Sequence, residues 1–234
     1  MAGEPATPLL ETRALSGHID GQRVVDEVSW AFASGTLTAI VGAAGAGKTS
    51  YLDLISGQRR ASAGSVWLRG RDITTLPVPV RARRGIGRAF QQAQAFGLLS
   101  VVENVRLAVQ ARRGEAFQLG SLWNDHRNTL ERAHALVERV GLGERADEPA
   151  GGLVQTEPRR LEPAMLMALE PSVYLFDAPT AGLGAREAAV LMDLIRALKH
   201  QRDKAIVLVE QRIDVVREVA DRIVVLHAGR QGHR

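Results

Sequence analysis

A glycine-rich segment near residue 45 has the residue types and spacing needed to bind phosphate. Residues 42–49 read GAAGAGKT and match the pattern G-x-x-x-x-G-K-[ST], with the apolar run Leu37 to Val41 before them and the helical pattern Ser50 to Ile55 after them. The glycines let backbone N–H groups point toward phosphate oxygens, and the N-terminus of the following helix adds a partial positive charge. We therefore predict a nucleotide site; the alternative is a strand-to-helix turn that binds nothing.

Two side chains of this segment indicate the chemistry of the predicted site. Lys48 has the position that contacts the β- and γ-phosphates, and the Thr49 hydroxyl has the position that binds Mg²⁺. The nucleotide-binding residues predicted in the segment are Gly42, Gly45, Ala46, Gly47, Lys48, Thr49 and Ser50.

A carboxylate follows the apolar run Val173 to Phe176, which predicts a buried strand that ends at Asp177. In phosphate-loop folds an aspartate at this place holds Mg²⁺. A lone aspartate at a strand end more often caps a helix or forms a turn, so the metal role depends on the phosphate segment. The next residue is Ala178, where a nucleotide hydrolase normally has a second acid.

Short apolar runs alternate with helical patterns in much of the chain. The pattern from Arg186 to His200 has apolar residues at helical spacing. Because strands that alternate with helices are typical of parallel sheets, we predict an α/β fold. The predicted strands are Arg23 to Phe32, Leu37 to Val41, Ser65 to Leu68, Ile86 to Phe90, Val173 to Phe176, Ala205 to Val209 and Arg222 to Leu226.

The middle of the chain has no convincing strand pattern between residues 100 and 169. A capping box at Ser100 to Glu103 predicts a helix toward Arg112, and a second helix is predicted from Arg127 to Val140. A third begins near Pro158. We predict a single domain over residues 1–234, with an α/β core at 1–91 and 170–234 and a helical insert at about 92–169.

Composition excludes several classes of protein. The chain has 45% hydrophobic residues and no cysteine, so it has enough apolar residues for a core and has neither disulfides nor cysteine-ligated metals. Its apolar runs are far shorter than the roughly 20 residues that span a bilayer, and no secretory signal is visible. The net charge is +4, but the arginines are scattered apart from the cluster Arg81 to Arg84, so we expect no nucleic-acid partner.

The order of these features resembles the nucleotide-binding subunits of ABC transporters from about Leu9 to Gly229. The stretches GIGRAFQ at residues 85–91 and VVENV at 101–105 look most like the ATP-binding subunit of branched-chain amino-acid importers. The resemblance implies a P-loop NTPase core with an N-terminal antiparallel β part and an inserted helical subdomain. It also implies ATP and Mg²⁺ as ligands, with Gln91 contacting the metal beside Thr49 and Asp177.

The resemblance implies partners as well. Such subunits work as head-to-tail dimers on membrane permease subunits, and each nucleotide site joins the phosphate loop of one chain to the signature motif of the other. We therefore expect a second nucleotide-binding subunit and permease subunits. The expected location is cytoplasmic, peripheral on the inner face of the cell membrane.

The sequence departs from the family at the positions that carry the chemistry. Ala178 stands where the family has the glutamate that orients the attacking water, and Gln211 stands where it has the switch histidine. LVQTE at residues 153–157 replaces the serine and glycines of the signature motif. Because loss of a positioned general base typically costs about 10²–10⁴-fold in rate, we expect slow or absent turnover and assign no catalytic residue.

Together these features predict an ATP-binding subunit of an ABC-type transporter, of the amino-acid importer kind, that binds Mg-ATP with impaired hydrolysis. Damage to both halves of the composite site favours a heterodimer. Two alternatives stay open: an active transport ATPase that uses a non-standard base or a residue of its partner, and a soluble ATP-binding module for regulation or interaction. Phosphate release with the partner subunits tests the first, and co-purification with a permease tests the second.

Overall fold

The computed structural model describes residues 8–89, 95–113, 123–154 and 156–232, so Gln91 and Gln155 lie outside the described residues. The chain divides into two compact units. The first unit contains residues 1–88, 172–178 and 196–234, and the second contains residues 89–171 and 179–195. The division at residues 91, 92, 169 and 170 stays a prediction from the sequence.

An antiparallel sheet forms the N-terminal part of the first unit, in the order β2-β1-β5-β6 with β3 paired to β1. The predicted strand from Arg23 to Phe32 is wrong in extent, because it is broken after Val28. There the Ser29 hydroxyl accepts the Ala14 N–H and the Thr12 hydroxyl accepts the Trp30 N–H, so side-chain oxygens replace ladder partners. The strands are β1 Leu10–Ile19, β2 Gln22–Val28, β3 Ala31–Phe32, β5 Ala63–Leu68 and β6 Arg71–Asp72.

A second sheet has the order β11-β10-β4-β9-β8-β7, and its β10–β4, β4–β9 and β9–β8 pairs are parallel. Every residue of β8 and β9 is buried, as expected for apolar strands in the interior of a parallel sheet. The predicted α/β class with an antiparallel N-terminal part is therefore confirmed. The strands are β4 Thr36–Val41, β7 Ile86–Ala89, β8 Val173–Asp177, β9 Ala205–Val209, β10 Arg222–His227 and β11 Arg230–Gln231.

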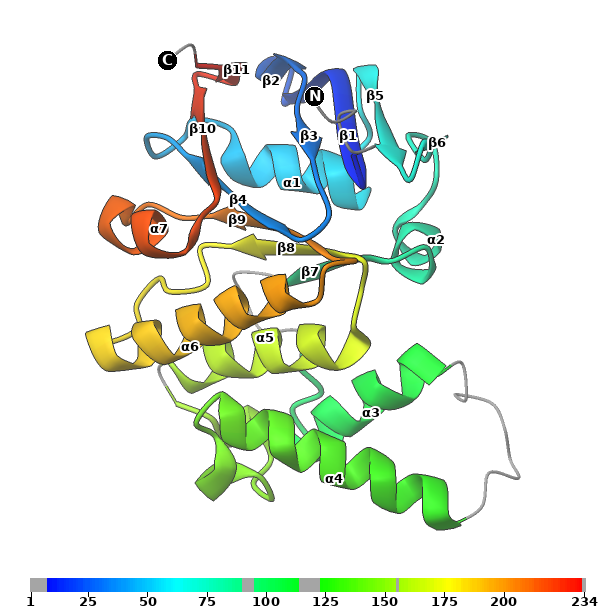
Figure 1. The fold of residues 1–234 in the computed structure, drawn as a ribbon, viewed down its shortest axis with the longest axis vertical. Helices are drawn as coiled ribbons and strands as arrows, with labels where there is room; N and C mark the ends of the chain where they lie inside the picture. Colours follow the sequence, from blue (N-terminus) through cyan, green and yellow to red (C-terminus); the bar gives the residue numbers. More distant parts are fainter. Residues whose placement is uncertain (1–7, 90–94, 114–122, 155, 233–234) are drawn as a thin grey trace, which may run out of the picture. The chain divides into compact units, whose positions relative to one another are not determined.

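Helix α1, Lys48–Ser56, lies between the two sheets of the first unit (Figure 1). Its Tyr51 is fully buried, meets the Trp30 ring edge-on at 4.9 Å and shares a 2.8 Å hydrogen bond with the Thr12 hydroxyl. Leu52, Leu54 and Ile55 join the same hydrophobic cluster as strands of both sheets. The core therefore fixes α1 and the loop that leads into it.

Arg81 on the short helix α2, Val78–Arg83, closes the far end of α1. Its guanidinium is buried and donates at 2.7 Å to the carbonyls of Leu54 and Ile55, and also to those of Thr74 and Leu76. Arg81 belongs to the arginine cluster Arg81 to Arg84 of the sequence, and it is buried because the carbonyls at the end of α1 need a donor there.

Arg81→Met is therefore expected to lower the free energy of unfolding by about 3 kcal/mol, since four carbonyls lose their donor. Urea denaturation followed by circular dichroism measures this loss. Arg83→Met on the same helix is the matched control, because Arg83 is exposed and should change stability by less than about 0.5 kcal/mol. Equal effects of the two variants would contradict the structural role of Arg81.

Helices dominate the second unit, and α3 packs against α4 and α5. The Ser100 half of the predicted capping box is confirmed: the Ser100 hydroxyl accepts the Glu103 N–H at 3.2 Å, whereas the Glu103 carboxylate accepts from Arg106. Buried Asn104 fixes the preceding loop by accepting the Phe96 N–H at 2.7 Å. Helix α4 begins earlier than the predicted Arg127. The helices are α3 Val101–Arg113, α4 Trp123–Arg139, α5 Glu157–Leu169 and α6 Ala185–Ala197, the last of which ends in the first unit.

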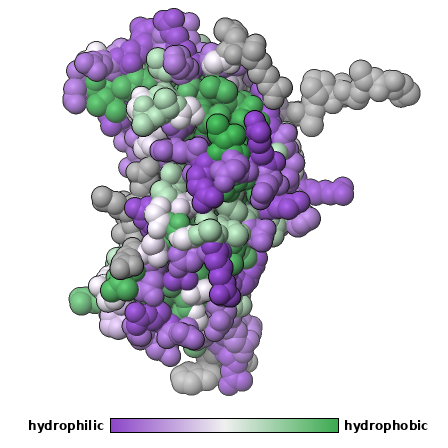
Figure 2. Space-filling model, turned by 90° about the vertical axis from the view of Figure 1, so that its left-hand side faces the viewer, coloured by the Kyte–Doolittle hydropathy of each residue, from purple (hydrophilic) through white to green (hydrophobic). Residues whose placement is uncertain are grey.

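The remaining helix of the first unit is α7, Ile213–Val219, and short 3₁₀ turns occur at residues 143–145, 150–152 and 198–200. In the described part of the chain, no helix has the length and apolar character needed to span a bilayer. Figure 2 shows hydrophilic side chains over much of one face, with hydrophobic ones interspersed.

Candidate nucleotide-binding site

The glycine-rich loop connects β4 to α1, and its backbone conformation and packing require glycine at several positions. Gly45 and Gly47 have φ angles of 76° and 94°, in the left-handed region that favours glycine. Gly42 is required by packing, because a Cβ there would lie 2.1 Å from the Leu226 carbonyl oxygen. The same holds for Gly47, where a Cβ would lie 2.2 Å from the Val24 carbonyl oxygen.

The rest of the loop is tied to its surroundings through the backbone. The Ala46 N–H donates to the Ala43 carbonyl at 3.1 Å, and the Ala46 carbonyl accepts the Gly229 N–H at 3.0 Å. Ala46 is buried, whereas Thr49 at the start of α1 is exposed and Ser50 is half-buried. The loop is therefore a fixed turn with its outer residues accessible, as a phosphate site requires.

Lys48 is the buried cation of this loop. Its Nζ donates to the carbonyls of Gly42 at 2.7 Å and Ala43 at 2.8 Å, and 6% of the residue is exposed. Burial lowers the pKa of the Lys48 ammonium, and the nearby Asp177 carboxylate opposes this shift. An anionic phosphate in the loop would offer this cation stronger partners than two neutral carbonyls.

Asp177 ends β8 and meets the phosphate loop in the same unit. Its Oδ1 accepts the Thr49 hydroxyl at 3.2 Å, although β9 lies between β4 and β8. Burial is the main cause that raises the pKa of Asp177, and Arg88 acts against it. The structure therefore brings together Lys48, Thr49 and Asp177, as the sequence predicts.

The donor set of this site suits Mg²⁺. Thr49 Oγ1 and Asp177 Oδ1 are hard oxygen atoms 3.2 Å apart, and Mg²⁺ is usually held by one or two such groups together with substrate phosphates. Among the described residues, no group of three or more histidine, cysteine, aspartate or glutamate side chains could hold a metal by itself. Gln91, the third predicted ligand, lies outside the described residues.

Sequence reasoning missed Arg88, which reaches the site from β7. Its side chain is 5% exposed and pairs with Asp177 at 3.1 Å and with Asp53 of α1 at 2.5 Å. A charged residue inside the apolar run Ile86 to Phe90 is the signal that could have found it, because a buried charge needs a partner.

The residues that follow β8 and β9 lie at the same edge of the sheet as Asp177. Ala178 is buried, and its N–H donates to the Val209 carbonyl at 2.8 Å. Gln211, the predicted switch position, is exposed. Glu210 is 2% exposed, and its carboxylate accepts the Gln211 N–H at 2.8 Å. Because β8 and β9 pair Asp177 with Val209, Glu210 is a second buried acid at the same sheet edge that sequence reasoning left without a role.

The segment that replaces the signature motif belongs to the second unit. Val154 is 55% exposed, and its N–H donates at 3.0 Å to the Glu157 carboxylate at the start of α5. Glu157 also pairs with Arg145 at 3.3 Å, and the Val154 N–H is the main cause that lowers the pKa of Glu157. This acid therefore caps its own loop.

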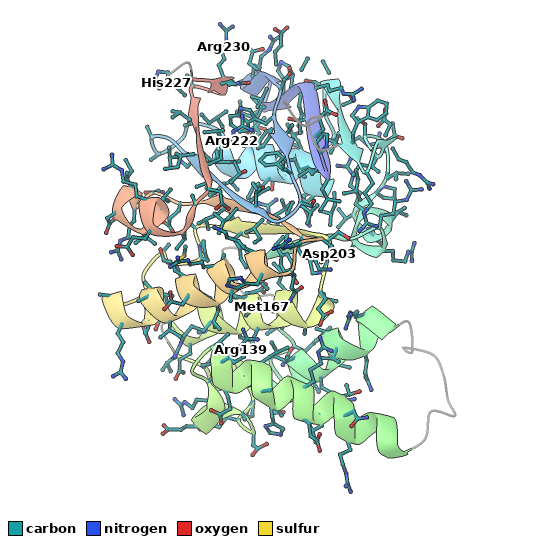
Figure 3. The ribbon with its side chains drawn as sticks, viewed as in Figure 1. Arg139, Met167, Asp203, Arg222, His227 and Arg230 are labelled. Carbon is teal, nitrogen blue, oxygen red and sulfur yellow. The ribbon has the colours of Figure 1, made fainter. Side chains whose placement is uncertain are left out.

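A small ion-pair cluster borders the phosphate loop. Asp26 accepts from Arg23 at 2.6 Å and from Arg230 at 2.7 Å, and its N–H donates to the Gly229 carbonyl. Arg230 extends from β11 near the chain end (Figure 3). Because Gly229 also contacts Ala46, the cluster holds β10, β11 and the loop together.

The fold and the site are those of a phosphate-loop α/β nucleotide-binding domain. The glycine-rich loop follows β4, and Asp177 lies at the end of β8. The family model described as "ABC transporter" matches residues 25–181. The chain therefore belongs to the ABC transporter family.

Comparisons with individual proteins agree with this assignment. The high-affinity branched-chain amino acid transport ATP-binding protein LivG of Salmonella typhimurium is 31% identical over 95% of this chain and 89% of its own length. The corresponding protein BraF of Pseudomonas aeruginosa is 30% identical with the same coverage. The sulfate/thiosulfate import ATP-binding protein CysA of Nephroselmis olivacea is 32% identical over 89% of this chain but 57% of its own length.

Solved structures show the same fold. A dimeric ATP-binding cassette in a post-hydrolysis state, bound to ADP and Pi, matches with a TM-score of 0.81 and 23% identity over 95% of this chain and 97% of that one. A nucleotide-free cassette of an ABC transporter matches with a TM-score of 0.79 and 22% identity, covering 96% and 90% of the two chains.

Proposed function

We propose that this chain is the Mg-ATP-binding subunit of an ABC importer, and that it binds nucleotide but hydrolyses it slowly or not at all. One observation carries the proposal: Lys48 lies within the glycine-rich loop and Thr49 meets Asp177, as a phosphate and metal site requires, while buried Ala178 follows Asp177. The binding half of the site is intact, and the expected position of the water-orienting acid has no carboxylate.

Each residue of the binding half has a distinct role. The backbone N–H groups of the loop and the N-terminus of α1 receive the phosphates, and Lys48 Nζ moves its hydrogen bonds from the loop carbonyls to the phosphate oxygens. Thr49 and Asp177 would hold Mg²⁺, which neutralises phosphate charge when bound. Ala178 cannot accept a proton from water, and its N–H is used by Val209.

Calorimetry with Mg-ATP, combined with a phosphate-release assay, tests this proposal. We expect saturable binding and turnover close to background. Absence of binding even at millimolar nucleotide would overturn the nucleotide site. Robust turnover of the purified chain would overturn the impaired hydrolysis and leave the binding site standing.

Glu210 supports the alternative of an active ATPase with a non-standard base, because it is a buried carboxylate at the edge that holds Asp177. On the main proposal, Glu210→Gln leaves the low turnover unchanged. On the alternative, it lowers turnover with the partner subunits by about 10²–10⁴-fold. Glu218→Gln on α7, an exposed acid, is the matched control for the charge change.

Amino acids are the proposed cargo class, because LivG and BraF match this chain over 95% of its length. CysA, a sulfate/thiosulfate import protein, has a similar identity of 32%, so identity alone does not select the cargo. We propose a heterodimer with an intact second nucleotide-binding subunit, bound to permease subunits on the inner face of the membrane. Co-purification with a permease supports this assembly, and association with soluble partners alone favours the regulatory module.

A further inference from the structure

Arg88 joins three elements of the first unit at the metal position. From β7, its Nη1 lies 2.5 Å from Asp53 Oδ1 and 3.2 Å from the Ser56 hydroxyl, both on α1. Its Nη2 lies 3.1 Å from Asp177 Oδ2 on β8. The side chains of Arg88 and Asp177 are 5% and 1% exposed, so this pair has little screening by solvent.

The two carboxylate oxygens of Asp177 therefore have different partners. Oδ1 accepts the Thr49 hydroxyl on the side of the phosphate loop, and Oδ2 pairs with the fixed cation of Arg88. A divalent cation that binds Asp177 would share the negative charge of this carboxylate with the Arg88 guanidinium. Between buried charges a few ångströms apart, repulsion between the guanidinium and the metal offsets a large fraction of the attraction between the metal and Asp177.

Asp53 modulates this competition because it shares the same guanidinium. With a side chain that is 21% exposed, it takes up part of the positive charge that Asp177 would otherwise face alone. Arg59 also approaches Asp53, at 3.9 Å, and its side chain is 38% exposed. Asp53 is therefore placed to share the charge of the guanidinium that faces Asp177.

We propose that Arg88 is a built-in counter-ion of Asp177 that limits how much Mg²⁺ adds to nucleotide affinity, and that Asp53 tunes this effect. This inference rests on the proposed nucleotide-binding function. It makes Arg88 a positioning residue for the metal: nucleotide binds with weak dependence on Mg²⁺ because part of the charge that the metal supplies is already present. The rival reading is a purely structural ion pair that holds α1, β7 and β8 together.

Three variants separate these readings. Arg88→Gln removes the cation, and Arg88→Lys keeps a positive charge in the same place. Asp53→Asn leaves the cation facing Asp177 alone. Arg59→Gln is the matched control, because it removes an arginine that approaches Asp53 at 3.9 Å, whereas the arginine paired with Asp177 is Arg88.

The measured quantity is the affinity for a non-hydrolysable ATP analogue, by calorimetry, in excess Mg²⁺ and in EDTA. We expect the ratio of the two affinities to rise about tenfold in Arg88→Gln, to fall several-fold in Asp53→Asn, and to stay near the wild-type ratio in Arg88→Lys and Arg59→Gln. Electron paramagnetic resonance of Mn²⁺ with saturating analogue should show tighter Mn²⁺ binding in Arg88→Gln.

Thermal unfolding shows whether each variant is folded, and Asp53→Asn keeps the test valid if Arg88→Gln does not fold. An unchanged ratio in folded Arg88→Gln, or a ratio in Asp53→Asn that does not fall, overturns the role of Arg88. If the wild type binds no analogue in either condition, the proposed function itself fails, which is a distinct outcome.

Discussion

Lys48→Ala is expected to weaken Mg-ATP binding at least about a hundredfold. The Nζ is held inside the loop by the carbonyls of Gly42 and Ala43, so it is already placed where phosphates would bind. Loss of charged hydrogen bonds to a phosphate costs about 3 kcal/mol, which corresponds to this factor. Isothermal titration calorimetry of the purified variant measures it.

The stability of the same variant provides a second check. Lys48 is a buried cation whose pKa burial lowers, and its acceptors Gly42 and Ala43 are half-buried and exposed, so water can replace it there. Its removal should therefore leave the free energy of unfolding without nucleotide unchanged or higher. Lys204→Ala is the matched control: Lys204 directly precedes β9, at the amino end of the strand, and pairs with Asp203. Wild-type affinity in Lys48→Ala, or equal weakening in Lys204→Ala, would contradict the assigned role of Lys48.

The geometry of the glycine-rich loop could be predicted because its information is local. Eight consecutive residues fix the turn, the cation and the hydroxyl, and the closeness of Leu226 and Val24 explains why Gly42 and Gly47 cannot be larger. Asp177 was predictable because an apolar strand that ends in a carboxylate is a recurring pattern of this class.

The electrostatic surroundings could not be predicted, because they join distant residues. Arg88 and Asp177 are 89 residues apart in the chain. The sequence of β7 does not indicate which of its residues lies beside the end of β8. Arg81 lies in an arginine-rich stretch and is buried because of the helix end that it meets, not because of its own neighbours.

The fold shows the same division. Strands of the parallel sheet were predictable from continuous apolar runs, since both faces are buried. The break between β2 and β3 was not, because it depends on hydroxyl groups of Thr12 and Ser29 that replace backbone partners. Periodicity alone cannot identify such replacements.

Restoring the two missing polar groups, by Ala178→Glu with Gln211→His, is expected to leave turnover at least about a hundredfold below that of an intact ATPase. The deficit is expected because the pair leaves the segment at residues 153–157 unrestored; a carboxylate at residue 178 would also be buried, at a cost in stability. Phosphate release by the double variant measures the result. Thermal unfolding shows whether the added charge destabilises the domain.

The signature segment explains why this pair is not sufficient. In the head-to-tail dimer that the family resemblance implies, the γ-phosphate of one chain would meet the other chain's signature segment, and here Glu157 caps Val154 in place of a free serine and glycines. Groups that act as a unit are non-additive, so the remaining gain should appear only when both halves are restored. We therefore expect turnover to rise by about a further 10²-fold when the double variant also carries Val154→Ser, Gln155→Gly, Thr156→Gly and Glu157→Gln. Full activity of the double variant alone would mean that this segment has no part in catalysis, and no gain in the combined variant would mean that the catalytic positions lie elsewhere.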